Sequence, residues 1–332
     1  MLADEFDESV LDDELSSSKA VGLSYEVRET EVGQRLDKLA SACFSEFSRA
    51  SLQKFIEKGE LLVNGVAVKP KYAVKMGDVL CLQTVLREHS ADLPEDIPLE
   101  ICYEDEEVLV INKPAGMVVH PGAGNAKGTL VNALLHHYPE QAHLPRAGLV
   151  HRIDKDTTGL LLVAKTAKAQ LNLIEQLKEK SVYRHYQCVV AGTLPSLAAH
   201  RTIDLPIARH PRERTKMAVR QGGKTAVTHL TNITPLNERY CLLDVALETG
   251  RTHQIRVHLS HVGHALVGDR VYGTRQPKAI NQAERELLLA FSRQALHAHT
   301  LGFRHPATGK SIEVVATLPE DMKQLILALS EF

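Results

Sequence analysis

The feature that most constrains this chain is a charged turn that runs directly into an apolar strand at residues 151–165, HRIDKDTTGLLLVAK. The uninterrupted apolar run from Leu160 to Val163 has the length of a strand buried on both faces, so the residues before it lie on a turn at its mouth. Gly159 is expected to be the pivot. The turn gathers two acids, two bases and a histidine: His151, Arg152, Asp154, Lys155 and Asp156.

Charges at the mouth of a buried strand must find partners, because a partly desolvated charge is costly. Charged turns of this kind occur both as solvated loops and as functional turns, and the composition of the turn does not choose between the two. The choice depends on what the rest of the chain contributes.

Length and composition favour a globular protein of about two domains. Of the 332 residues, 44% are hydrophobic and 24% are charged. No apolar run approaches the about 20 residues of a membrane-spanning helix, and the N-terminus lacks the segments of a secretory signal. We therefore expect a cytoplasmic protein with no membrane association. The five cysteines are widely spaced, without a C-x-x-C pair, and are expected to be reduced thiols.

The net charge of −2 hides an asymmetry. The first 15 residues contain seven acids and no Lys or Arg, so the remaining residues carry 39 basic against 34 acidic side chains. Residues 1–20 are expected to be a disordered acidic tail. The remainder is only mildly basic, so nucleic-acid binding has to be argued from local clusters and not from the pI.

Residues 21–85 show the pattern of a small α/β domain. Two helices are expected near residues 36–43 and from a Ser48 cap to Gly59, followed by a hairpin with a type I′ turn at Asn64-Gly65, in which residues 61–63 pair with 66–68. The helix and hairpin carry basic side chains suited to a phosphate backbone: Arg49, Lys54, Lys58 and Lys69. The order QRLDKLA, SRASLQKFIEKGELLVNG and MGDVL resembles the S4 RNA-binding domain.

Residues 86–98 are polar and contain two prolines, which is typical of a linker. The second domain, residues 99–332, alternates predicted strands and helices. Thr129 is expected to cap a helix over 130–137, and Thr252 one that Gly263 ends. The segment 209–220 shows no core-forming periodicity and is expected to be a basic loop that contacts a polyanion or solvent, through Arg209, Arg212, Arg214 and Lys216.

Several common chemistries are not supported by the motifs. The histidines near residues 253–264 lack the spacing of a metal site. Asp154 and Asp156 stand too close along the turn to flank a sugar as a glycosidase pair does. The chain contains no P-loop, no G-x-G-x-x-G and no G-x-S-x-G sequence, so neither a nucleotide cofactor nor that class of hydrolase is indicated.

Four segments taken in order indicate a family. NKPAGMVVHP, HRIDKDTTGLLLVAK, the Y-x-x-V of residues 186–189 and GRTHQIRVHL resemble the successive motifs of the ribosomal large-subunit pseudouridine synthases. The resemblance covers residues from about 25 to the C-terminus. It implies an α+β protein: an S4-type α/β domain followed by a catalytic domain built on a mixed, mainly antiparallel β-sheet flanked by helices and loops.

The resemblance also implies roles for single residues. Asp154 matches the catalytic aspartate of the family, and Arg256 matches the arginine that pairs with it. Arg152 matches the arginine that helps to displace the target base, and Tyr186 matches the tyrosine that packs on the flipped uracil. Ile153 stands where leucine is more usual, which keeps the apolar character of the position.

The implied reaction breaks the N1–C1′ bond of uridine and rejoins uracil through C5, with no net oxidation, so no cofactor is expected. The resemblance implies action on 23S ribosomal RNA, at the helix 69 hairpin loop, in the large ribosomal subunit or its precursor, by a monomer. The main alternative is a non-catalytic S4-type RNA-binding factor of ribosome assembly. A nucleic-acid hydrolase acting through Asp154 is a second alternative. The residue set Asp154, Tyr186 and Arg256 favours the enzyme.

Overall fold

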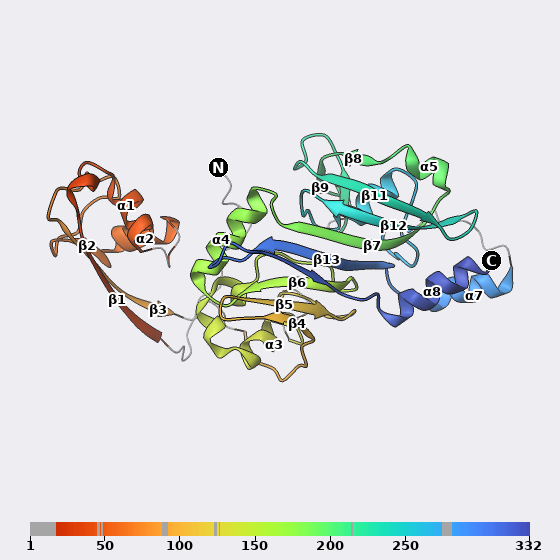
Figure 1. Ribbon diagram of the computed structural model, residues 1–332, viewed down its shortest axis with the longest axis horizontal. Helices are drawn as coiled ribbons and strands as arrows, with labels where there is room; N and C mark the ends of the chain where they lie inside the picture. The colour runs from red at the N-terminus through yellow and green to blue at the C-terminus, as the bar shows by residue number, and fades with distance from the viewer. Residues whose placement is uncertain are drawn as a thin grey trace. The chain divides into compact units, whose positions relative to one another are not determined.

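The computed structural model describes residues 18–44, 47, 49–87, 92–122, 125, 127–213, 215–273 and 281–332 (Figure 1). The chain divides into two compact units, Met1–Ala91 and Asp92–Phe332. Most of the predicted acidic tail lies outside the described residues. Ser18–Glu26 forms strand β1, so the residues 18–20 that were assigned to the tail belong to the first sheet.

The first unit packs two helices on a three-stranded antiparallel sheet of order β1-β3-β2. Its other elements are α1 Leu36–Cys43, α2 Arg49–Lys58, β2 Leu61–Val63 and β3 Val79–Arg87, with a 3-10 turn at Glu29–Glu31. Asn64 and Gly65 have φ of 52° and 75°, as a type I′ turn requires. The predicted pairing of 61–63 with 66–68 is wrong beyond one bridge between Val63 and Val66, because β2 pairs with β3 instead. The predicted cap, Ser48, lies outside the described residues.

The second unit is built on a mixed sheet of nine strands, ordered β4-β5-β6-β13-β7-β12-β11-β8, with β14 beside β13. All of its described pairings are antiparallel except that of β13 with β6. The strands are β4 Ile101–Glu104, β5 Val108–Lys113, β6 Thr158–Ala164, β7 Tyr183–Ala191, β8 Thr202–Asp204, β11 Val227–Pro235, β12 Tyr240–Leu247, β13 Leu296–Arg304 and β14 Ser311–Val315. A separate two-stranded ribbon joins β9 Ile207–Arg209 and β10 Met217–Val219.

Helices cover both faces of this sheet. They are α3 Leu130–His137, α4 Ala167–Lys178, α5 Leu194–Ala198, α6 Gln254–His261, α7 Gln282–Ala290 and α8 Glu320–Ser330, with 3-10 turns at Pro139–His143 and Pro145–Gly148. Leu161 and Val163 of β6 join the core that contains α3 and α6, whereas Leu160 and Leu162 join the core that contains α4. The apolar run was therefore correctly interpreted as a strand buried on both faces.

Strand β13 lies in the middle of the sheet, between β6 and β7 (Figure 1). The approach of β13 to β6 depends on Gly159, which has φ of +111° and whose added Cβ would lie 2.2 Å from the carbonyl oxygen of Ala298. Only glycine fits this contact. The predicted pivot is therefore a point of close backbone approach.

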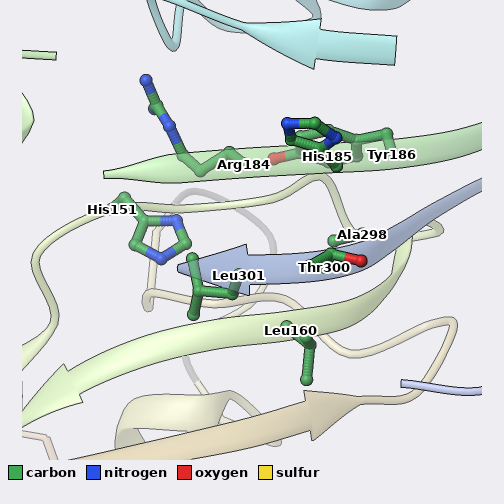
Figure 2. A pocket seen from close by; sticks show the side chains of 8 residues that line it. All are labelled: His151, Leu160, Arg184, His185, Tyr186, Ala298, Thr300 and Leu301. Carbon is green, nitrogen blue, oxygen red and sulfur yellow. The ribbon is translucent and has the colours of Figure 1, made fainter. Parts of the chain in front are cut away.

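The side chain of His151 accepts a backbone hydrogen bond from β6 beyond the point where β6 pairs with β13. The two strands pair only at Thr158–His297 and Gly159–Ala298, and farther along β6 the amide of Leu162 donates to Nε2 of His151 at 3.0 Å. The ring lies beside Leu301 of β13 (Figure 2). Because Nε2 accepts this bond, the imidazole must be neutral, and burial lowers the pKa of His151 to about 3.

We expect His151 to make the folded state sensitive to acid. Its pKa in the folded state lies below the ordinary value of 6.5, so the stability that it contributes is full above that value and is lost as the pH falls from about 6.5 toward 3. His151→Gln keeps an acceptor for Leu162 and should reduce the pH slope of unfolding free energy by about 1.4 kcal/mol per pH unit in this window. Urea unfolding at several pH values measures the slope. The same slope in His151→Gln and in the exposed control His261→Gln would contradict this expectation.

Residues 92–98, assigned to the linker from their composition, make specific contacts within the second unit. The side-chain amide of Asn132 donates to Leu93 O at 2.7 Å, and the carboxylate of Glu95 accepts from the amide of Gly128 at 3.0 Å. Ile97 packs against the main core. The second unit therefore begins near Asp92, several residues before the predicted boundary at Leu99.

Candidate active site

The turn before β6 is held in place by contacts with distant segments. The amide of Thr157 donates to Asp154 O at 3.1 Å and closes the turn. Lys113, which is fully buried at the end of β5, donates to the carbonyl oxygens of Pro114, Met117 and Lys155 at 2.7, 2.9 and 2.8 Å. Burial lowers the pKa of Lys113 to about 7. Three donated bonds nevertheless require the ammonium form, because a neutral amine has only two N–H donors.

Arg256 lies between two carboxylates. One amino group, Nη1, donates to Oδ2 of Asp154 at 2.8 Å. The Nε and Nη2 groups form a bidentate pair with Asp269, at 2.7 and 3.0 Å. The side chains of Asp154, Arg256 and Asp269 are 14%, 7% and 0% exposed. The arginine is therefore fixed by Asp269 and presents one remaining edge to Asp154.

Charge and burial act in opposite directions in this triad. Burial alone would lower the pKa of Arg256, but the hydrogen bonds and charges of Asp269 and Asp154 raise it. Burial would raise the pKa of Asp269, whereas Arg256 and the amides of Tyr272 and Val271 lower it. The cation and its buried anion are thus ionised together.

Tyr186 and His253 both lie near enough to Asp154 to interact with its charge. Tyr186, on β7, is 6% exposed, and burial raises its pKa, as does the charge of Asp154. Tyr183 is 68% exposed, which confirms that the two tyrosines lie on opposite faces of the strand. His253 lies with Nε2 3.9 Å from Oδ1 of Asp154, and its Nδ1 is 2.8 Å from the hydroxyl of Tyr272.

Arg152 is exposed and has no hydrogen bond or ion pair with the described residues. Burial is the largest cause that lowers the pKa of His253 and of His120. The charge of Arg152 lowers both pKa values further. Arg152 therefore lies near the opening of the site with its guanidinium available. Asp156 forms no ion pair with the described residues, and its backbone carbonyl accepts from Arg293 at 3.3 Å. The two aspartates of the turn thus have different surroundings.

Asp269 and Tyr272 are not among the site residues predicted from the sequence. They belong to the turn G-D-R-V-Y-G at residues 268–273. The ring of Tyr272 lies 5.0 Å from the guanidinium carbon of Arg256. An aspartate followed by a tyrosine in a short glycine-bounded turn was the available signal. The prediction that Thr252 caps α6 is wrong. The N-cap residue is His253, which has φ of 58° and makes no capping hydrogen bond with its side chain.

The predicted RNA-binding residues are mostly exposed. Arg49 on α2 is 50% exposed and pairs with the buried Asp37 at 2.9 Å. The segment 209–220 is a loop only in part: it contains the last residue of β9, the connection after it and β10, Met217–Val219. Lys216 there pairs with Glu213 at 2.6 Å, and Arg214 lies outside the described residues. The other predicted positions are exposed: Lys54, Lys58, Lys69, Arg209 and Arg212.

Within the described part of the chain, no group of His, Cys, Asp or Glu side chains is arranged to hold a metal ion. No described helix is long and apolar enough to cross a membrane.

Comparison with known proteins gives the family. Residues 107–261 match the model of RNA pseudouridylate synthases, and residues 34–80 match the S4 domain. The chain is 49% identical, over 90% of its length and 90% of the relative, to ribosomal large subunit pseudouridine synthase D of Xylella fastidiosa. It is 47% identical, over 93% of the chain and 94% of the relative, to the protein of the same name from Escherichia coli K12.

The chain belongs to the RNA pseudouridine synthases. A solved human synthase, RNA pseudouridylate synthase domain containing 4, shares the fold with a TM-score of 0.53 and 23% identity, over 70% of this chain and 93% of that one. The match to the family model includes Asp154, Tyr186 and Arg256, and ends before Asp269. The family and the predicted α+β architecture are thus confirmed.

Proposed function

We propose that this synthase converts specific uridines of 23S ribosomal RNA, in the helix 69 hairpin loop, to pseudouridine. It would act on the large ribosomal subunit or its precursor, in the cytoplasm, as a monomer and without a cofactor. Two observations support the substrate: the relatives with 47–49% identity carry the name of a ribosomal large-subunit enzyme, and an S4 domain precedes the catalytic unit. The contact that carries the proposed chemistry is Asp154–Arg256 at 2.8 Å.

The geometry favours Oδ1 of Asp154 as the oxygen that acts on the substrate. Oδ2 accepts from Arg256, whereas Oδ1 has no hydrogen bond with a described residue and lies 3.9 Å from His253. A carboxylate with one oxygen fixed and one free can serve as a nucleophile or can stabilise a cation. Attack on ribose C1′, attack on uracil C6 and abstraction of a ribose proton all use that same oxygen.

Because the target bond lies within stacked RNA, the uridine must leave its stack before it reaches Asp154. Tyr186, which is buried beside Asp154, would cover the displaced uracil. Arg152, exposed at the opening of the site, would fill the gap in the RNA. The basic side chains of α2 and of the β9–β10 ribbon would hold backbone phosphates and contribute affinity.

The deciding experiment is to map pseudouridine in ribosomal RNA from cells with and without the gene, by chemical adduct formation and primer extension. The proposal expects the helix 69 stops to disappear without the gene and to return with the wild-type enzyme. Stops that persist in the absence of the gene would reject this substrate.

Arg152→Ala should slow the reaction on a structured hairpin more than on an RNA whose target uridine is already unpaired. Eversion of the uridine costs a few kcal/mol from a paired stack and less from a loose strand. The loss of kcat/KM caused by Arg152→Ala should therefore be about tenfold larger on the hairpin than on the unpaired RNA. Single-turnover rates on the two RNAs measure the difference. Equal losses on both RNAs would assign Arg152 to general charge or to chemistry, and Lys155→Ala, at an exposed position of the same turn, is the matched control.

A further inference from the structure

Arg184 is a buried cation without an anionic partner among the described residues. Its side chain extends from β7 and the residue is 8% exposed (Figure 2). Its Nε has no hydrogen-bond partner, and Nη2 reaches only the carbonyl oxygen of Glu248, at 3.4 Å. No described residue gives it a carboxylate partner. Burying an unpaired guanidinium is costly, so a residue in this state calls for an explanation.

The carboxylate of Glu248, whose backbone oxygen Arg184 contacts, has other partners. The two oxygens of Glu248 pair with Lys180 and His229, each at 2.7 Å. The second charge that acts on Arg184 is that of Arg251, which is positive and lowers the pKa of Arg184 further after burial. Because a second cation acts on Arg184 and the carboxylate of Glu248 is occupied, an anion would stabilise this site.

The position of Arg184 relates it to the proposed active site. Arg184 and Tyr186 alternate with His185 on β7, so their side chains leave the same face of the strand about 7 Å apart. The charge of Arg184 acts on Tyr186, as does that of Asp154. A nucleotide whose base lies on Tyr186 would therefore have its own phosphate within reach of Arg184.

Gly250 preserves the space for this guanidinium. A Cβ at residue 250 would lie 2.6 Å from Nη1 of Arg184. The amino group thus occupies the volume that any other residue at 250 would fill. Gly250 directly precedes Arg251, whose Nε is bonded to Thr225 O at 3.0 Å and whose side chain is exposed.

We propose that Arg184, assisted by Arg251, binds the phosphate group adjoining the everted uridine of the RNA substrate. This inference rests on the proposed function and adds a phosphate subsite to it. The bound phosphate supplies the anion that the buried guanidinium lacks, and it fixes the register of the strand so that the base next to it is the one placed against Tyr186 and Asp154.

The test combines enzyme variants with RNA hairpins that carry one uncharged methylphosphonate, either 5′ or 3′ of the target uridine. Arg184→Gln should weaken binding of the unmodified hairpin by about 10- to 100-fold. At one of the two positions, the methylphosphonate should weaken binding to the wild-type enzyme by a similar factor and leave binding to Arg184→Gln unchanged. The inference would be overturned if, at both positions, the methylphosphonate weakened binding to Arg184→Gln as much as binding to the wild-type enzyme. It would also be overturned if Arg184→Gln bound the unmodified hairpin like wild type.

Thermal unfolding separates a binding residue from a structural one. Removal of an unpaired buried charge should leave Tm unchanged or raise it, so Arg184→Gln should bind RNA weakly while being at least as stable as wild type. A lower Tm with unchanged affinity would instead make Arg184 a structural residue. Gly250→Ala, which crowds Nη1 without removing the charge, should give a smaller loss at the same phosphate. Arg304→Gln, an exposed cation of β13, controls for general charge.

Pseudouridine formation by the wild-type enzyme on the unmodified hairpin tests the proposed function separately. If the wild-type enzyme forms product while the methylphosphonates weaken binding to both enzymes equally, the phosphate subsite fails and the function stands. If the wild-type enzyme binds the hairpin without forming product, the proposed function fails, and the binding measurements still decide whether Arg184 contacts the phosphate.

Discussion

Asp154→Asn is expected to abolish pseudouridine formation while RNA binding is kept. Asparagine is nearly isosteric with aspartate and can still accept the hydrogen bond from Arg256, but it lacks the charge that a nucleophile or ion stabiliser requires. Turnover should fall by about 1,000-fold or more. The free energy of unfolding should fall by only about 1 kcal/mol, because Arg256 keeps its bidentate pair with Asp269.

Turnover and RNA affinity should be measured on the same preparation of Asp154→Asn, beside Asp156→Asn. The second variant makes the same chemical change two residues away, at a side chain without an ion pair among the described residues. Near-normal turnover in Asp154→Asn would refute the assignment. So would loss of turnover in Asp156→Asn alone.

Asp269→Asn, unlike Asp154→Asn, should cause a large loss of stability. Asp269 is fully buried and both of its oxygens accept from Arg256. Loss of this charge leaves a buried guanidinium with Asp154 as its only carboxylate, and turns an amide N–H₂ toward a donor. Breaking a buried pair from one side typically costs about 3–5 kcal/mol. Turnover should fall as well, because Arg256 no longer holds Asp154 in a fixed orientation.

Asp321→Asn is the matched control for Asp269→Asn. Asp321 forms the same bidentate pair with Arg293, at 2.7 and 2.8 Å, but its side chain is 46% exposed. Solvent screens the half-exposed carboxylate of Asp321, although Arg293 itself is 8% exposed, so loss of Asp321 should cost clearly less than loss of the fully buried Asp269. Urea unfolding of both variants gives the comparison. Equal costs for the two substitutions would show that burial does not determine the strength of the Arg256–Asp269 pair.

Local signals in the sequence were sufficient to locate much of the fold. Thr129 caps α3 as predicted, since its hydroxyl accepts from the amide of Asn132. The pattern also predicts two closing strands within about residues 297–317 and a final helix from Pro319 to Ser330, and β13, β14 and α8 lie there. These features depend on neighbouring residues, which a sequence displays directly.

The features that were missed depend on contacts between distant segments. Thr252 does not cap α6. The side chain of Gln254 holds the turn before this helix instead, because its Oε1 accepts from the hydroxyl of Thr249 and from the amide of Arg251. The periodicity of residues 167–180 predicts a buried stripe of Leu171, Ile174 and Leu177. These side chains are only half-buried in α4, and Leu173 is the leucine that is fully buried. The periodicity of the helix alone does not show which of its neighbouring residues makes the deepest contact.

The proposed site was predictable in part for the same reason. Asp154, Tyr186 and Arg256 are carried by recognisable motifs, and the structure brings Asp154 and Arg256 together at 2.8 Å. Asp269 and Arg184 are single residues whose significance depends on burial and on the partners they have or lack. That information exists only in three dimensions.

Strand β13 lies in the middle of the sheet but is synthesised after both of the strands beside it, β6 and β7. Thr158, which begins the strand after the active-site turn, bonds His297, a residue that is synthesised 139 positions later, and Arg293 reaches back to the carbonyl of Asp156. Contacts of such separation form slowly and late. During translation, the turn that carries Asp154 emerges long before the strand that supports it. We therefore expect the nascent chain to be inactive until residues 293–304 have left the ribosome.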